Sequence, residues 1–168
     1  MDSFIERVFI SEIKTQCEFA LKAVEKLRQK LELGDTRPVF FYAQAFLGAA
    51  GNVSKLLWPR SPKIPGRGER LRELLRVPDD SPAEPRTFRN HFEHFDERLE
   101  NWAMTSKRKV FVDFNVASVE GPADFMRNLD PNSLTLTFRG ETYELGSVER
   151  ALKEIQKVAE ARLNERWH

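Results

Sequence analysis

The order of apolar and polar residues along the chain predicts a mainly helical protein. In the first thirty residues, apolar positions recur at alternating steps of four and three, which is the period of an α-helix. These positions are Ile13, Cys17, Ala20, Val24, Leu27 and Leu31. A glycine at Gly34 and a proline at Pro38 are typical of the end of one helix and the start of the next. The second helix, at roughly residues 39–58, is apolar almost all round and rich in alanine and glycine, which favours a central helix packed against several neighbours.

Two proline-rich breaks divide the middle of the chain. The segment 59–68 holds three prolines and two glycines and is expected to be a loop, followed by a short basic helix that ends near Arg76. A second break at 78–85 precedes a further helix. Its apolar stripe again has steps of four and three and consists of Phe88, Phe92, Phe95, Leu99 and Trp102.

From Lys109 onward the pattern changes to an alternation of period two, which predicts strands. We expect a small antiparallel sheet at about residues 110–145. Ser147 then caps a last helix, whose apolar side consists of Val148, Leu152, Ile155, Ala159 and Leu163. The predicted fold is mainly α: a bundle of four to five helices in a single domain over residues 1–168, with a small antiparallel β insert before the last helix.

Composition and charge narrow the class of protein. The 27 basic and 26 acidic residues give a net charge of +1, which argues against a broad electrostatic binder of nucleic acid and leaves room for a local site. No apolar run reaches the roughly 20 residues needed to span a bilayer, and the N-terminal residues lack the pattern of a signal peptide. We therefore expect a cytoplasmic protein without a membrane partner. Cys17, the only cysteine, lies on a buried stripe and is expected to be inert.

Candidate chemistry concentrates on the fourth predicted helix. His91 and His94 lie there with Arg89 and Asn90, away from the apolar stripe or at its border. Histidine suits proton transfer at neutral pH, and arginine can hold a phosphate through two parallel hydrogen bonds. The alternative is that this polar face is simply solvated surface. For His91, which lies beside the phenylalanines, a structural role at the core boundary is favoured.

A metal site is a separate interpretation of the same helix. His91 and His94 lie three residues apart, and Glu93 or Glu97 would add a carboxylate. Metal sites in helical bundles usually draw ligands from several helices, and the first two helices have no histidine. We predict no metal and no cofactor.

The motif Arg89-Asn90-x-x-x-His94 resembles the R-x(4–6)-H signature of the HEPN superfamily, the higher eukaryotes and prokaryotes nucleotide-binding domains. The pairs Arg86/His91 and Arg162/His168 match the spacing too, but only Arg89 is followed by the small polar residue that the family prefers. Many family members are metal-independent endoribonucleases. The resemblance implies that His94 is the acid–base residue, Arg89 the phosphate clamp and Asn90 the orienting group. The expected product is a 2′,3′-cyclic phosphate.

The resemblance also implies a homodimer. Arg89 and His94 lie about 140° apart around a helix, so one copy cannot easily direct both side chains to one phosphate. In RNA-cleaving family members two such helices face each other, which here predicts a twofold interface through Asn90, His94 and Glu97. Toxin–antitoxin and phage-defence proteins of this kind have an antitoxin protein as a further partner.

Basic residues near the motif are candidates for contacts with an RNA backbone. The predicted substrate-binding residues are Arg67, Arg70, Lys107 and Arg108. Neighbouring acids would neutralise part of this charge. Trp58 and Trp102 end apolar stripes and are expected in the core. The alternative function is a catalytically silent HEPN-like module that binds a nucleotide or a protein partner.

Overall fold

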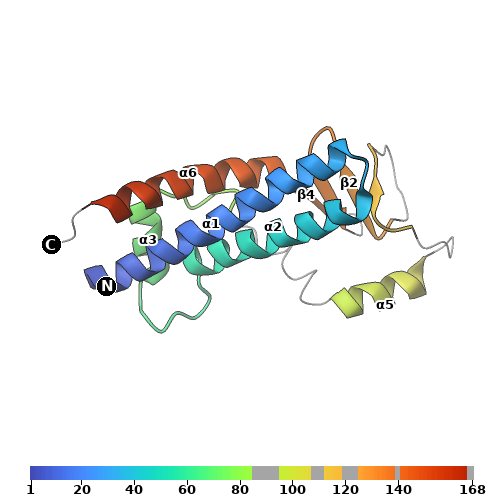
Figure 1. Cartoon of the computed structure of the whole chain (residues 1–168). Coiled ribbons are helices and arrows are strands. Elements are labelled where there is room, and N and C mark those ends of the chain that lie inside the picture. The colour runs from blue at the N-terminus through green and yellow to red at the C-terminus, as the bar shows by residue number, and fades with distance from the viewer. Residues whose placement is uncertain (85–94, 107–111, 119–124, 139–140, 166–168) are drawn as a thin grey trace.

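The computed structural model describes residues 1–84, 95–106, 112–118, 125–138 and 141–165 (Figure 1). Within these ranges five helices and four strands follow one another, with the sheet directly before the last helix. They are α1 (Ser3–Glu32), α2 (Thr36–Leu57), α3 (Arg67–Leu75), α5 (Phe95–Thr105), β1 (Asn115–Val116), β2 (Arg127–Asp130), β3 (Thr135–Phe138), β4 (Glu141–Glu144) and α6 (Leu145–Asn164). The prediction of a mainly α fold with a small β insert is confirmed.

The central helix is α1, which packs along α2 on one side and α6 on the other (Figure 1). Its predicted stripe is buried, because Ile13, Cys17, Ala20, Val24 and Leu27 are at most 1 % exposed. The expectation that the second helix is the central one is wrong, since Phe41 is 67 % exposed and Ala45 and Gly48 are also exposed. Small side chains carry little apolar area, so exposing them costs little free energy, and their abundance does not indicate burial on every side.

The turn between α1 and α2 follows the predicted glycine signal. Gly34 has a φ of +69°, in the left-handed region that glycine adopts without strain. The N–H of Gly34 donates to the Leu31 carbonyl at 3.0 Å, and that of Asp35 donates to the Lys30 carbonyl at 3.1 Å. These bonds satisfy the last carbonyls of α1 and reverse the chain into α2.

The sheet has the order β1-β2-β3-β4 and is mixed. The pairs β2/β3 and β3/β4 are antiparallel, as expected, whereas β1 runs parallel to β2 with Asn115 opposite Asn128. The prediction of an antiparallel sheet is therefore wrong for β1. Alternation of apolar residues fixes which face of a strand is buried, and Leu136 and Phe138 are buried as it indicates, but it carries no information on strand direction.

The sheet is fixed to the end of the bundle where α1 ends and α2 begins (Figure 1). The carboxylate of Asp113 pairs with Arg127, and these side chains are 4 % and 12 % exposed. The guanidinium of Arg127 lies 4.2 Å from the centre of the Phe114 ring, which in turn meets Phe40 of α2 edge to face at 5.4 Å. This stack connects the β insert to the helical core.

The last helix begins directly after β4. Its N-cap is Glu144, and Ser147 lies within the first turn, where its hydroxyl donates to the Glu144 carbonyl at 2.9 Å. The predicted cap at Ser147 is thus too late, because the strand leads into the helix without a loop. On the predicted apolar side of α6, Leu152, Ile155 and Ala159 are at most 3 % exposed, and Val148 and Leu163 are partly buried. Leu145 and Glu149 are buried as well. Of the helices in the described ranges, none combines the length and the apolar character needed to cross a bilayer.

Candidate functional site

The predicted catalytic residues lie in a part of the chain that the structure does not describe. Arg89, Asn90 and His94 fall within 85–94, as does His91, and Lys107 and Arg108 fall within 107–111. The predicted dimer interface through Asn90, His94 and Glu97 stays a prediction, with only Glu97 placed, on an exposed position of α5. Among the described residues no group of three or more acidic, cysteine or histidine side chains is arranged to hold a metal ion.

Of the predicted RNA-binding residues, Arg67 and Arg70 are described, and both lie on α3 at the opposite end of the bundle from the sheet (Figure 1). Arg70 is neutralised by two carboxylates. Its Nε donates to Glu6 Oε1 at 2.8 Å, and its Nη1 donates to Glu73 Oε2 at 3.2 Å. The hydrogen bond that Arg70 donates to Glu6, followed by the one that it donates to Glu73, raises the pKa of the Arg70 guanidinium. Because Glu6 is buried in α1, Arg70 connects α3 to the central helix.

Arg67 has different surroundings. Its guanidinium lies 4.6 Å from the centre of the Phe9 ring, and its Nη2 donates to the Lys55 carbonyl at 3.3 Å. Its Nε is buried without a hydrogen-bond partner among the described residues. Burial lowers the pKa of Arg67. Arg67 thus holds a partly desolvated positive charge against an aromatic ring and a carbonyl, with no carboxylate paired to it in the described part of the chain.

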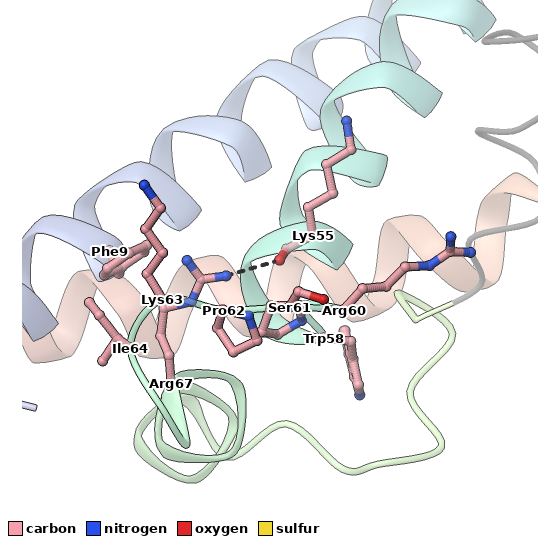
Figure 2. A pocket seen from close by; sticks show the side chains of 10 residues that line it. Phe9, Lys55, Trp58, Arg60, Ser61, Pro62, Lys63, Ile64 and Arg67 are labelled. Atoms are coloured by element: carbon pink, nitrogen blue, oxygen red, sulfur yellow. Dashed lines mark hydrogen bonds between the residues drawn. The ribbon is translucent and has the colours of Figure 1, made fainter.

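Arg67 lines a cavity of about 560 Å³ between the start of α1, the end of α2 and the loop that follows α2. Four of its lining residues are basic and none is acidic. The lining residues are Phe9, Lys55, Trp58, Pro59, Arg60, Ser61, Pro62, Lys63, Ile64 and Arg67 (Figure 2). We name this space the basic cavity.

The side chains of the basic cavity are not all directed the same way. In Figure 2 the Lys63 side chain and the Arg67 guanidinium are next to each other, and Arg67 meets Lys55 at its backbone carbonyl. The side chains of Lys55 and Arg60 extend in other directions. Neither Arg60 nor Lys63 takes part in an ion pair or hydrogen bond with the described residues. The concentrated charge is therefore that of Lys63 and Arg67.

The loop is held in place by a close contact between α3 and α2. Gly66 has a φ of +68° and is the N-cap of α3. At Gly68, a Cβ atom would lie 2.6 Å from Pro59 Cδ and 2.7 Å from the Leu57 carbonyl oxygen, so only glycine fits. The first turn of α3 can thus lie directly on the end of α2, which brings Arg67 back over the Lys55 carbonyl.

Arg72 completes this packing from the next turn of α3. Its Nη1 donates to the Leu57 carbonyl at 2.7 Å, and its Nε donates to Asp79 Oδ1 at 3.0 Å. Its guanidinium carbon lies 5.5 Å from the centre of the Trp58 ring. Trp58 is 8 % exposed and Trp102 7 %, so the prediction that both belong to the core is confirmed. In the basic cavity Trp58 forms part of the wall.

A second cavity, of about 660 Å³, lies between α6 and residues 75–82. Its wall is mainly apolar, and its basic side chains, Arg76, Arg150 and Lys157, are accompanied by Glu154. The charge of this cavity is thus partly balanced from within its own wall, unlike that of the basic cavity. The basic cavity is the better candidate for binding an anion.

The sequence indicates Arg67 as a candidate and places Lys63 in the same basic run, but it does not indicate that Phe9 and Lys55 belong to the site. A signal was present, because the chain has four basic residues and no acidic one from Lys55 to Arg67. The contribution of Phe9 had no such signal, since it comes from another helix. The expectation that Cys17 is buried is confirmed, and burial raises the pKa of its thiol to about 12.

No protein-family model, curated protein or solved structure gives a significant match to this chain.

Proposed function

We propose that the protein is a metal-independent endoribonuclease of the HEPN type that acts as a homodimer. The observation that carries the proposal from the structure is the basic cavity, with four basic lining residues and no acidic one in a chain of net charge +1. An RNA backbone is bound chiefly through its phosphates, and a local excess of positive charge supplies that attraction. The motif Arg89-Asn90-x-x-x-His94 supplies the candidate chemistry. An RNA substrate fits the cytoplasmic location expected from the sequence.

The proposed reaction is a transesterification. The 2′-oxygen attacks the adjacent phosphorus, a bond from phosphorus to O2′ forms, and the bond from phosphorus to O5′ breaks. One histidine accepts the 2′-hydroxyl proton, and a second group donates a proton to the departing 5′-oxygen. In a dimer the two copies of His94 would fill these two roles, while Arg89 balances the charge on the non-bridging oxygens. The products are a 2′,3′-cyclic phosphate and a 5′-hydroxyl.

The test is RNA cleavage in the presence of EDTA by wild type, His94→Ala and Arg89→Ala, purified in parallel. We expect wild type to cleave RNA and the His94 variant to be slower by about 100-fold or more, since acid–base groups contribute rates of that order. A matched control is Lys22→Gln on an exposed position of α1, which should cleave like wild type. Equal cleavage by wild type and His94→Ala, or no cleavage by wild type, would refute the endoribonuclease.

The second candidate is a catalytically silent HEPN-like module that binds a nucleotide or a protein partner. The size of the basic cavity favours its nucleotide form, because sites for small ligands are typically about 300–1,000 Å³. Retained nucleotide binding with no RNA cleavage would support this candidate. A role as a toxin, with an antitoxin protein as partner, would be tested by whether expression of wild type but not His94→Ala arrests growth.

A further inference from the structure

We propose that the basic cavity binds a phosphate monoester carried by a nucleoside, through Lys63 and Arg67. Two ligands share this chemistry, a free mononucleotide and the 5′-phosphorylated end of an RNA. The RNA form of the ligand rests on the proposed function, whereas the phosphate site itself does not.

The arrangement of charge favours a monoester over the diesters inside an RNA chain. A phosphate monoester carries about −1.5 to −2 charges at neutral pH, whereas an internal phosphodiester carries about −1. The charged groups of Lys63 and Arg67 are next to each other in Figure 2, and no carboxylate is among the described residues that line the cavity. A dianion balances this charge more completely than a monoanion does.

Arg67 is the residue most clearly prepared for an anion. A guanidinium has five N–H donors, and among the described residues the guanidinium of Arg67 makes a single hydrogen bond, to the Lys55 carbonyl. The ring of Phe9 supports the guanidinium from one side and restricts where it can lie. A positive charge that is partly buried and lacks a counter-ion is stabilised when an anion enters the site. A planar guanidinium can meet two phosphate oxygens at once.

The apolar wall indicates that the phosphate carries an organic group. Inorganic phosphate occupies the volume of only a few water molecules, at about 30 Å³ each, so the cavity of about 560 Å³ leaves most of its space to another part of the ligand. That space is bounded by rings and aliphatic carbon from Phe9, Trp58, Pro59, Pro62 and Ile64. Such a wall suits the sugar and base of a nucleoside better than a second charged group.

The experiment measures binding of a 2′-O-methyl RNA decamer, labelled at its 3′ end, by fluorescence anisotropy. One form carries a 5′-phosphate and the other a 5′-hydroxyl. The decamer has no free 2′-hydroxyl to attack its phosphates, so the proposed nuclease cannot cleave it. We expect the 5′-phosphorylated form to bind wild type about tenfold more tightly. AMP and adenosine serve as competitors, and displacement by AMP but not by adenosine identifies the free mononucleotide as a ligand of the same site.

The variants are Arg67→Gln and Lys63→Gln, with Lys22→Gln as the matched control. Each of the first two should weaken binding of the 5′-phosphorylated decamer or of AMP by about 5- to 30-fold, and Lys22→Gln should leave it unchanged. Lys63 is exposed and Lys22 is exposed, so neither substitution should alter folding, which circular dichroism would check. Each variant of the cavity should also reduce the slope of log affinity against log salt concentration.

Two results would overturn the inference. The first is equal affinity of wild type for both decamers together with no binding of AMP. The second is preferential binding of the phosphorylated ligand that neither Arg67→Gln nor Lys63→Gln weakens. No cleavage by wild type in the EDTA assay, with phosphate binding retained, would refute the endoribonuclease and leave this site standing. Cleavage that depends on His94, with equal affinity for both decamers and no binding of AMP, would do the reverse.

Discussion

Two glycines in helices, Gly68 and Gly48, should respond in opposite ways to the same substitution. An alanine within a helix is ordinarily more stable than a glycine by up to about 1 kcal/mol, because glycine loses more backbone freedom on folding. At Gly48 a Cβ atom would have nothing within 4 Å, so Gly48→Ala should gain this free energy of folding. At Gly68 the added Cβ would meet the end of α2.

The size of the effect at Gly68 follows from the distances. A Cβ at 2.7 Å from the Leu57 carbonyl oxygen must retreat by about 0.7 Å to reach 3.4 Å, where ordinary contact begins. Moving α3 by that amount would also lengthen the 2.7 Å bond from Arg72 to the same carbonyl. Overpacking of this kind costs about 1–3 kcal/mol, which offsets the helical gain of up to about 1 kcal/mol and leaves a net loss of up to about 2 kcal/mol.

The assay is thermal and urea unfolding of both variants and wild type, followed by circular dichroism at 222 nm. The free energies of unfolding of the two variants should differ by about 1–3 kcal/mol, or roughly 2–12 °C in Tm for a domain of this size. Gly68→Ala should also weaken binding of a 5′-phosphorylated RNA, because the contact positions Arg67. A Gly68→Ala variant as stable as Gly48→Ala would refute the close packing of α3 on α2.

Three further predictions concern buried polar and reactive groups. Burial raises the pKa of Glu149, but hydrogen bonds from Arg28 and Lys153 outweigh it and lower that pKa below its ordinary value. The ionised form therefore stabilises the fold above the ordinary pKa, and Glu149→Gln should cost about 1 kcal/mol in urea unfolding at pH 7 and less as the pH falls below 4. Asp113→Ala should cost about 1.5–3 kcal/mol in the same assay, because it removes two hydrogen bonds to the charged guanidinium of Arg127, and a loss below 1 kcal/mol would contradict the pairing. Cys17 should react with a thiol reagent at pH 8 only after unfolding, and rapid labelling of the native protein would contradict its burial.

The elements of the helical core could be predicted from the sequence because their signals are local. The buried stripe of α1 follows from spacing alone, and Gly34 lies where an α-helix must end in a left-handed residue. The predicted start of α6 is three residues too late, since β4 passes into the helix without the loop that would make Ser147 a cap.

The relative positions of elements could not be predicted in the same way. The direction of β1 beside β2 depends on how the chain returns across the sheet, and no residue in Asn115–Val116 encodes it. The choice of α1 as the central helix depends on which helix faces two partners. Strand direction and the choice of the central helix depend on how two or more elements pack together, whereas periodicity is a property of a single element.

The charged residues of the candidate site show the same difference between what the sequence predicts and what depends on packing between elements. Arg67 and Arg70 lie three residues apart on one helix, and from the sequence alone they are equivalent members of a basic run. Their surroundings in the structure differ, because Arg70 donates to Glu6 of α1, whereas Arg67 lies against the ring of Phe9, which also belongs to α1. The 27 basic and 26 acidic residues nearly balance in number, but in some places they form specific pairs and in others the basic residues are in local excess. An anion-binding site in a nearly neutral protein requires its acidic residues to lie away from the site. The position of the acidic residues elsewhere in the chain is therefore what creates the local excess of positive charge.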